Sequence, residues 1–482
     1  MPGDAVRPLR RAAVLAAVIA AAVAAPAQAQ SDQTAYVATE TGAVFQYGFG
    51  PAGGLAALSP PSVAASSAAQ DVAVSSDGFS VYVAGEAAID QYDLLTDGTL
   101  GPKNPPSVAA PVGAVAIVVS PDHTSVYAAA DDAPAVLQYS VSVAGSTLVP
   151  KARPSVPLPA GTKAGGVAIS PDGRSVYASF VTNSANTPAS IAQFDVGAGG
   201  ALTPKSPAIV AAGTGPAGAV VVSADGRSVY VANAGSDTIS QYDVGAGGRL
   251  TPKSVSAVGT NADQPADIAL TPDGASAYVA DLGDPGAPGS GAVTQYTVNA
   301  DGSLALKRPS TVPAAGHPTS IAVSADSASV YVTSDDAVLQ FTIGAGGKLT
   351  PKSTPSVPSG GQTRGVALAP LVASDDDDVL YGTAGDDVIR GRGGDDVVRG
   401  LRGDDVLVGG RGSDRLIGGP GADRIRGGPG RDVLKGGPGR DVIDARDGAP
   451  DRVQCGAGRD VALADVSDHV HGCERVIRAA VP

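Results

Sequence analysis

The sequence has no tryptophan, few other aromatic residues and, beyond its N-terminus, no long stretch with the hydrophobic spacing of a helix. Glycine and proline are abundant instead, at 64 and 38 residues. Together these features indicate an all-β, turn-rich chain. Its 482 residues leave room for two or more domains.

Basic residues and enzyme motifs are also scarce. The formal net charge of −14 argues against a general nucleic-acid binder and suits cation binding better. The four histidines form no HExxH pair and no Ser-His-Asp order, and the sequence has no P-loop. No apolar or amphipathic segment supports a pore-forming toxin, and none beyond the N-terminus is long enough to span a bilayer.

Residues 1–29 are expected to be a secretory signal peptide. Three arginines precede the apolar run AAVLAAVIAAAVAA, and Ala27-Gln28-Ala29 is a cleavage site of the A-x-A kind. A membrane anchor is the alternative, but the run is short and ends at Pro26. We therefore expect a secreted, extracellular protein, either free or attached to a cell surface, with no transmembrane segment after cleavage. In such a chain the two cysteines, Cys455 and Cys473, favour a disulfide over a metal or catalytic pair.

A unit of about 45–55 residues repeats seven times through residues 30–370. It has an alternating strand ending in a turn such as SPDG, a tyrosine strand, a Gln-aromatic strand, and a fourth strand such as GRLTPKS. The strand tyrosines are Tyr36, Tyr82, Tyr127, Tyr177, Tyr230, Tyr278 and Tyr331. The Gln-aromatic pairs begin at Gln46, Gln91, Gln138, Gln193, Gln241, Gln295 and Gln340. Small hairpin sheets repeated in this way predict a seven-bladed β-propeller.

The phase of the repeat indicates how the ring closes. The first unit starts at its tyrosine strand, and the missing inner strand, GVALAP, stands at residues 365–370. We predict that this strand completes the first blade, which leaves no exposed sheet edge.

The run VSADGRSVYVANAGSDTISQYDVGAGGRLTPKS resembles the YVTN-type, lactonase-like seven-bladed propellers. The resemblance implies the fold, but the family includes lactone hydrolases as well as binding and surface proteins. A lactone hydrolase needs a base or metal to activate water and a charge to stabilise the oxyanion. His317 and Arg364, each just before an inner strand on the expected ligand-binding face, are the candidate catalytic residues, and Lys163 has a similar place. His123 replaces a glycine of a hairpin turn, so we expect a solvated turn residue.

Loops after the tyrosine strands should open on the same face and give it an acidic rim. The rim residues are Glu40, Glu86, Asp131, Asp132, Asp237, Asp281, Asp284, Asp335 and Asp336. They could hold a cation or polar ligand, although such charges are usually solvated.

Residues 371–444 form a second repeat, with nonapeptides such as GGPGADRIR, GGPGRDVLK and GGPGRDVID at 418–444. Position six is always aspartate: Asp378, Asp387, Asp396, Asp405, Asp414, Asp423, Asp432 and Asp441. Position eight is always aliphatic. The repeat resembles the hemolysin-type (RTX) calcium-binding nonapeptide, which implies a parallel β-roll. The strict phase disfavours a disordered linker, which lacks a period.

Two nonapeptides make one coil of 18 residues, so aspartates two repeats apart should face each other. The expected pairs are 378/396, 387/405, 396/414, 405/423, 414/432 and 423/441. Hard oxygen donors in a flexible site suit Ca²⁺ better than Mg²⁺ or Zn²⁺. Without the ion the carboxylates repel and the aliphatic core is thin, so we expect folding to depend on Ca²⁺. Position five changes from Asp386, Asp395 and Asp404 to Arg431 and Arg440, which predicts weaker later sites.

Residues 445–482 lose the period, and we expect a disulfide-tied cap on the roll, with His469 and His471 on its surface. A cleaved signal peptide is at odds with the one-step export typical of RTX proteins. The favoured interpretation is a secreted calcium-binding protein. Its propeller binds an extracellular protein, glycan or small molecule, and its roll is a stabiliser or surface spacer. The alternative is an extracellular lactone hydrolase with its site at the channel mouth of the propeller.

Overall fold

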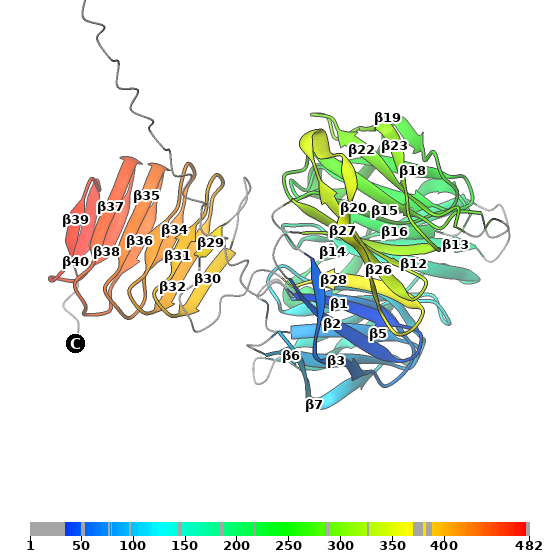
Figure 1. Ribbon diagram of the computed structural model, residues 1–482, viewed down its shortest axis with the longest axis horizontal. Coiled ribbons are helices and arrows are strands. Elements are labelled where there is room, and N and C mark those ends of the chain that lie inside the picture. The colour runs from blue at the N-terminus through cyan, green and yellow to red at the C-terminus, as the bar shows by residue number, and fades with distance from the viewer. Residues whose placement is uncertain are drawn as a thin grey trace, which may run out of the picture.

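The computed structural model describes residues 34–49, 54–75, 78, 80–95, 98–142, 147–182, 188–215, 217–284, 287, 289–324, 327–369, 379–381 and 388–478. These residues form a seven-bladed propeller and a parallel β-solenoid of about 5 turns (Figure 1). The predicted all-β fold class is therefore confirmed. The predicted signal peptide, residues 1–29, lies outside the described part of the chain. Among the described residues, no helix has the length and apolar character needed to cross a membrane.

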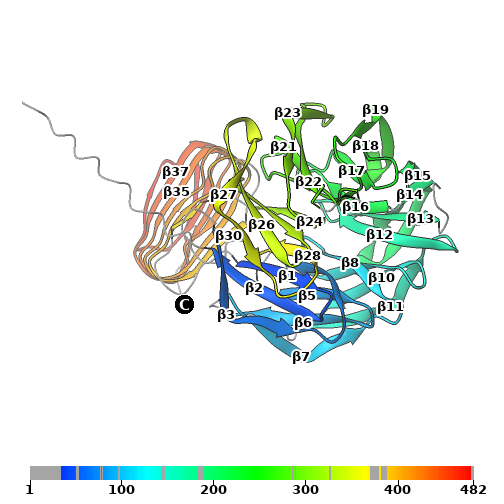
Figure 2. The ribbon, with the colours of Figure 1, turned by 45° about the vertical axis from the view of Figure 1, so that its right-hand side comes forward.

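Each blade is an antiparallel sheet of four strands that runs outward from the centre of the ring (Figure 2). The inner strands are β28 (Thr363–Leu368), β4 (Ala69–Val74), β8 (Ala114–Val119), β12 (Thr162–Ile169), β16 (Ala217–Val222), β20 (Pro265–Leu270) and β24 (Pro318–Val323). The second strands are β1 (Thr34–Thr39), β5 (Ser80–Gly85), β9 (Ser125–Ala130), β13 (Ser175–Thr182), β17 (Ser228–Asn233), β21 (Ser276–Asp281) and β25 (Ser329–Ser334).

The third strands carry the Gln-aromatic pairs. They are β2 (Ala43–Phe49), β6 (Ala88–Leu94), β10 (Ala135–Val141), β14 (Pro188–Val196), β18 (Thr238–Val244), β22 (Ala292–Val298) and β26 (Ala337–Ile343). The outer strands are β3 (Leu55–Ala64), β7 (Leu100–Ala109), β11 (Leu148–Pro157), β15 (Leu202–Thr214), β19 (Leu250–Gly259), β23 (Leu304–Pro313) and β27 (Leu349–Pro358). Short 3₁₀ turns precede three of them: η2 (Ala198–Gly200), η3 (Ala246–Gly248) and η4 (Ala345–Gly347).

The second strands are buried along most of their length because neighbouring blades pack on both of their faces. One apolar cluster, for example, joins Tyr127 and Val136 of the third blade to Val176 and Phe194 of the fourth. Such blade-to-blade clusters, and not a single central core, supply the apolar contacts of the ring.

The ring closes through the C-terminal inner strand. β28 pairs antiparallel with β1, with Tyr36 opposite Ala367, so the first blade contains strands from both ends of the propeller. The recurring hairpin turns use a positive φ angle, 70° at Gly173, which glycine adopts without strain. His123 takes this place in the third blade at φ 57° and is partly exposed.

Buried glutamines of the third strands join each blade to the next. Gln340 of the seventh blade donates through Nε2 to the Thr354 carbonyl of its own outer strand at 3.0 Å. Its Oε1 accepts the backbone amide of Leu55, the first residue of β3, at 2.7 Å. The same amide-to-leucine contact recurs at the other six blade junctions. The Gln-aromatic motif is therefore a structural fastening.

The solenoid has two parallel sheets that share a row of aliphatic side chains. The first contains β29 (Val379–Tyr381), β31 (Val397–Arg399), β33 (Arg415–Ile417), β35 (Val433–Gly439), β37 (Arg452–Gly458) and β39 (His469–His471). The second contains β30 (Val388–Gly393), β32 (Val406–Arg411), β34 (Arg424–Arg426), β36 (Val442–Ala445), β38 (Val461–Ala464) and β40 (Arg475–Arg478). The core row is Leu380, Ile389, Val398, Leu407, Leu416, Ile425, Leu434 and Ile443.

Within the repeat, strands of the same sheet pair at a shift of 18 residues, as in Val397 opposite Arg415, so two nonapeptides do make one coil. The two sheets continue past residue 444, where β37 to β40 extend them. Val453 and Ala462 also extend the core row. The parallel coil therefore runs through the segment in which the sequence period is lost.

Candidate metal centre and pocket

Aspartates at position six stack along the two edges of the solenoid. The backbone amides of Asp396, Asp405, Asp414 and Asp423 each donate to Oδ1 of the aspartate 18 residues later, at 2.8–3.0 Å. This accounts for the expected pairs 396/414, 405/423, 414/432 and 423/441. Asp378 and Asp387, with the pairs that contain them, lie outside the described residues.

The second carboxylate oxygen of four stacked aspartates has no hydrogen-bond partner in the described part of the protein. Oδ2 of Asp414, Asp423, Asp432 and Asp441 is buried and accepts no hydrogen bond, and the four residues are at most 1% exposed. Burial, with a smaller contribution from neighbouring carboxylates, raises the pKa of Asp423 and Asp432 to about 7 and that of Asp441 to about 6. A buried, unsatisfied anionic oxygen is costly unless an ion or proton compensates for it.

Glycine at position one opens the space beside each of these oxygens. A Cβ at Gly418 would collide with Oδ2 of Asp423 and would lie 2.8 Å from the carbonyl oxygen of Gly436 in the next coil. A carboxylate oxygen and a main-chain carbonyl therefore face the same small gap. Within the described ranges no three acidic, histidine or cysteine side chains converge on one point, so the nearby main-chain carbonyls are the further protein donors to an ion here. An all-oxygen donor set of this kind fits Ca²⁺.

Position five has a different role. Oδ1 of Asp395 accepts the Ser413 amide at 2.6 Å, and Oδ1 of Asp404 accepts the Ala422 amide at 2.7 Å. Both aspartates are exposed and hold the next coil through its backbone. Arg431, farther along the roll, cannot accept such a bond. Weaker calcium binding at the later nonapeptides therefore stays a prediction.

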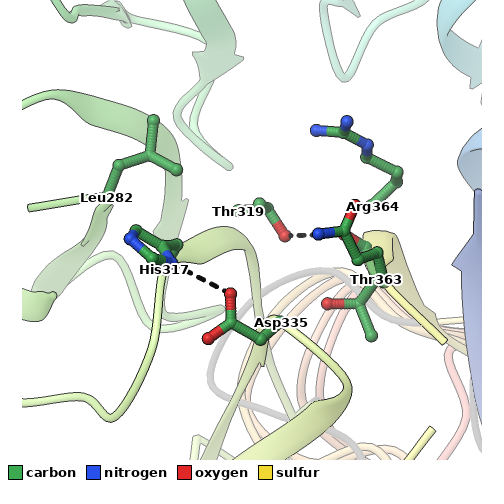
Figure 3. A pocket seen from close by; sticks show the side chains of 7 residues that line it. Leu282, His317, Thr319, Asp335, Thr363 and Arg364 are labelled. Atoms are coloured by element: carbon green, nitrogen blue, oxygen red, sulfur yellow. Dashed lines mark hydrogen bonds and ion pairs between the residues drawn. The ribbon is translucent and has the colours of Figure 1, made fainter. Parts of the chain in front are cut away.

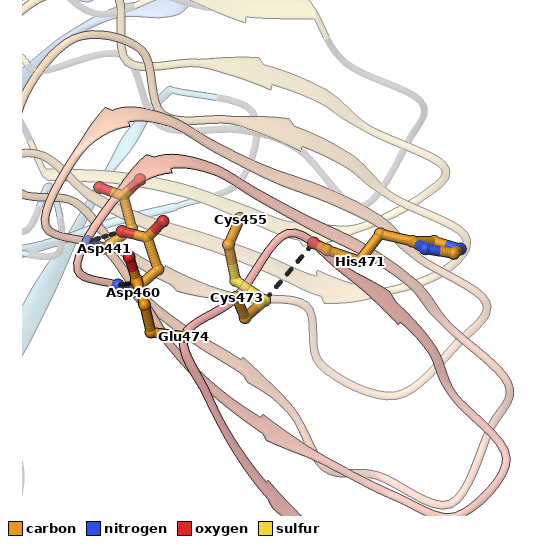
Figure 4. Close-up of a disulfide and its surroundings, with 6 residues drawn as sticks. All are labelled: Asp441, Cys455, Asp460, His471, Cys473 and Glu474. Carbon is orange, nitrogen blue, oxygen red and sulfur yellow. Dashed lines mark hydrogen bonds between the residues drawn. A yellow bond between two sulfur atoms is a disulfide. The ribbon is translucent and has the colours of Figure 1, made fainter.

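A disulfide joins Cys455, in β37, to Cys473, which follows β39 of the same sheet (Figure 4). His469 and His471 are exposed beside it. Sequence reasoning missed Asp451 and Asp460, whose Oδ1 atoms accept the amides of Asp432 and Asp441. Both positions keep the local pattern Asp-x-aliphatic. One residue is added before Asp451, so a search with a fixed period of nine residues does not find them.

His317 and Arg364 line one pocket of about 170 Å³ at the start of the inner strands β24 and β28 (Figure 3). Nδ1 of His317 lies 3.0 Å from Oδ1 of Asp335, and both side chains are partly exposed. Arg364 forms an ion pair with Glu40 of the first blade. Thr363, which also lines the pocket, is 2% exposed and its Oγ1 has no hydrogen-bond partner. The pocket thus combines an imidazole–carboxylate pair and a guanidinium.

The acidic residues predicted to form a rim have different environments, and not all of them are exposed. Asp335 lines the pocket, Glu40 pairs with Arg364, and Asp131 pairs with Lys163 at 3.2 Å. Asp281 is fully buried, and Oδ2 accepts the amide and hydroxyl of Thr294. Burial raises the pKa of Asp281 to about 7. The Asp281 side chain, at the end of β21, therefore lies inside the blade and is not part of the predicted rim.

Two inner-strand aspartates were not predicted. Asp71 accepts the Ile117 amide of the next blade at 3.0 Å, and Asp267 accepts the Ile321 amide at 2.9 Å. Burial raises the pKa of Asp71 to about 7. Both carboxyl groups hold neighbouring inner strands together. The alternating residue pattern of these strands does not predict the contact.

Protein-family models match parts of both the propeller and the roll. A model of the RTX calcium-binding nonapeptide repeat matches residues 372–407, 399–434 and 417–449. A model described as lactonase, 7-bladed beta-propeller, matches residues 204–282. No curated protein matches the chain. The stacked buried aspartates and the RTX match together imply that Ca²⁺ is a structural ligand of the roll.

Similar solved structures share the propeller fold. A Bacteroides fragilis protein proposed to be a 6-phosphogluconolactonase is 17% identical, with a TM-score of 0.59, over 72% of this chain and 100% of its own. The periplasmic gluconolactonase of Pseudomonas aeruginosa is 19% identical, with a TM-score of 0.58, over 71% and 100%. A Lactobacillus plantarum protein is 19% identical, with a TM-score of 0.56, over 70% and 99%. At these identities the likeness concerns the fold alone.

Proposed function

For a chain that joins a lactonase-type seven-bladed propeller to RTX calcium-binding nonapeptide repeats, we propose the role of a secreted calcium-binding protein. In this role the propeller is the ligand-binding module and the calcium-folded roll is a stabiliser or surface spacer. The observation that carries the proposal is the row of buried carboxylate oxygens without a hydrogen-bond partner in the roll.

Calcium controls the order of the roll in this proposal. Stacked carboxylates repel one another, and one aliphatic side chain per nonapeptide gives a core too small to offset the chain entropy. Ca²⁺ removes the repulsion and links successive coils, so that ion binding and folding become one event. Extracellular calcium modules bind at about 10⁻⁴–10⁻³ M, which would leave this roll unfolded in a low-calcium cytosol.

An extracellular location is supported by the repeats and by the disulfide, because cytosolic reductants would keep Cys455 and Cys473 reduced. Secretion through a signal peptide at residues 1–29 is part of the proposal and rests on the sequence pattern alone.

The outer surface of the roll supports a role in attachment. Its position-six carboxylates point inward, whereas Arg415 and Arg452 of the first sheet and Arg424 and Arg426 of the second are exposed. Once Ca²⁺ neutralises the inner acids, the outward face is cationic. Such a face favours contact with an anionic cell surface.

The pocket at His317 and Arg364 is the place where the propeller would take a polar ligand. It brings together groups from three blades: Arg364 of the first, Leu282 of the sixth, and His317 and Asp335 of the seventh.

A second candidate function, lactone hydrolysis, is favoured by the His317–Asp335 pair. If Nδ1 donates to Asp335, Nε2 is left as an acceptor, the form that a general base for water requires. Arg364 is less suited to stabilise an oxyanion because Glu40 already pairs with it. Because Arg364 is already paired with Glu40, a binding module stays the favoured role of the propeller.

Hydrolysis of a panel of sugar lactones by the full-length protein separates the two functions. His317→Ala is the test variant, and His123→Ala, in a distant hairpin turn, is its matched control. Turnover that is lost only in His317→Ala supports the hydrolase. No turnover by the wild type supports the binding module, provided that equilibrium dialysis of the same preparation shows bound calcium. A preparation without bound calcium contradicts the favoured role.

A further inference from the structure

The two rows of stacked aspartates do not stop where the nonapeptide phase stops. The backbone amide of Asp432 donates to Oδ1 of Asp451 at 2.8 Å, and that of Asp441 donates to Oδ1 of Asp460 at 2.9 Å. Both steps span 19 residues, against 18 within the repeat. One added residue thus shifts the sequence phase while the stack continues.

Each row then ends on an acidic residue with a different spacing. Asp468 accepts the Asp451 amide at 2.9 Å through Oδ1 and the Asp465 amide at 2.6 Å through Oδ2. Glu474 accepts the amide of Asp460, and Figure 4 shows the carboxylates of Asp441, Asp460 and Glu474 side by side. Asp451 and Asp460 are therefore the last stacked members of the rows before these closing residues.

Asp451 and Asp460 have the same unsatisfied atom as the aspartates of the repeat. Their Oδ2 atoms accept no hydrogen bond, although the residues are 0% and 1% exposed. Asp465, at 2% exposed, adds a buried Oδ1 without a partner. Asp465 lies near Asp451 because the carboxylate of Asp468 binds the amides of both.

The nearby arginines of the described chain do not compensate for these oxygens. Arg446 is engaged by both carboxylate oxygens of Asp444 at 2.8 Å. Arg478 donates to the main-chain carbonyls of Asp465 and Asp468 and not to their carboxylates. Among the described residues, therefore, none forms a hydrogen bond to these buried oxygens.

We propose that Asp460, and Asp451 together with Asp465, hold Ca²⁺ in the last coil of the roll, outside the nonapeptide repeat. This inference rests on calcium being the ion of the repeat, since the same donor type lies in the same rows. It extends the calcium rows to a segment that the repeat model does not reach, because that match ends at residue 449.

The disulfide gives these last sites a property that the repeat lacks. Gln454 and Gly456 pair with Lys435 and Gly437, so Cys455 stands where the preceding coil has a glycine. Its bond to Cys473 ties the coil covalently, whereas the repeat coils depend on ions for their cross-links. We expect this tie to lower the calcium concentration at which the last coil orders, because part of its chain entropy is already lost.

Equilibrium dialysis of the full-length protein against Ca²⁺ tests the proposal by counting bound ions. The double variant Asp451→Asn/Asp460→Asn is expected to bind about two fewer ions per chain than the wild type, because each Asn removes one anionic ligand. Asp444→Asn, whose side chain pairs with Arg446 and lies in the same segment, is the matched control and should bind as many ions as the wild type.

Tryptic cleavage after Arg452 and Arg459, mapped by mass spectrometry in the same full-length variants, gives a second readout. Protection of these bonds should need at least about tenfold more Ca²⁺ in the double variant. If the double variant does not order at any calcium concentration, the single variants decide by the same two measurements. An unchanged ion count in a variant with a wild-type circular dichroism spectrum overturns the proposal.

Asp414→Asn, in the middle of the repeat, separates the proposal from the function on which it rests. Loss of calcium in Asp414→Asn but not in the last-coil variants overturns the extension of the rows alone. No loss in either overturns the calcium role of the roll as a whole.

Discussion

Oδ1 of Asp414 lies 2.9 Å from the backbone nitrogen of Asp396, which donates a hydrogen bond to it. This contact fixes one carboxylate oxygen on the neighbouring coil and leaves Oδ2 buried without a partner. Repetition on both edges of the solenoid produces two rows of like charges inside a protein body. Such rows are stable only when cations or protons compensate for them.

Asp423→Asn should weaken the calcium response of the roll. Asparagine can still accept the Asp405 amide through its Oδ1, but it removes one negative charge beside the ion. We expect the midpoint calcium concentration for ordering to rise by roughly tenfold. Circular dichroism during a calcium titration measures this midpoint. Asp444→Asn should titrate like the wild type, and equal midpoints for all three proteins would argue against a ligand role for Asp423.

The calcium-free roll should lose stability as the pH rises. The folded-state pKa of Asp423 and Asp432 is about 7, above the unfolded value of 3.8, so the folded state binds more protons between these values. The resulting stabilisation is complete below about pH 4 and is lost as the pH rises through 7.

Thermal melts of the full-length protein in calcium-free buffer from pH 5 to 8 check this slope. In saturating Ca²⁺ the slope should reverse over the same range, because the ion binds the deprotonated carboxylates. A calcium-free roll that becomes more stable from pH 5 to 8 would show that the buried oxygens are satisfied in some other way.

Gln340→Leu should weaken the closure of the propeller ring. The substitution leaves the buried Leu55 amide and the Thr354 carbonyl without their partners. A buried unsatisfied group costs about 1–3 kcal/mol. Denaturant unfolding of the propeller measures the loss, and Gln454→Leu, at an exposed position of the roll, should have little effect. Equal midpoints for both variants would mean that the glutamine contacts do not hold the blades.

Cys455→Ala/Cys473→Ala should lower the stability of the roll in saturating calcium. The two cysteines are 18 residues apart, and closing a loop of this size contributes about 3 kcal/mol in the chain-entropy model. Urea unfolding followed by circular dichroism measures the difference, and wild type in reductant should match the double variant. If oxidised wild type and the variant unfold at the same urea concentration, the disulfide does not stabilise this coil.

Much of this architecture could be predicted from the sequence because it repeats. Tyr230, Gln241 and their equivalents mark every blade, and the fixed Asp-x-aliphatic step of the nonapeptides gives the coil of 18 residues. The resemblance to lactonase-like propellers and RTX repeats is confirmed on the same residues.

The remaining features depend on single insertions or on contacts between distant segments. One added residue before Asp451 hides the continuing stack from any fixed period. The pairing of His317 with Asp335 depends on how a loop folds back, and the burial of Asp281 depends on Thr294 in the next strand. A pattern of residue types does not determine contacts of this kind.

Amide hydrogen exchange of the full-length protein, in chelator and in millimolar Ca²⁺, tests the central claim most directly. Peptides from residues 388–443 should exchange quickly in chelator and slowly in calcium, while propeller peptides exchange alike in both. Equal protection of the repeat in the two conditions would contradict the account, because the stacked carboxylates would then be stable without a cation.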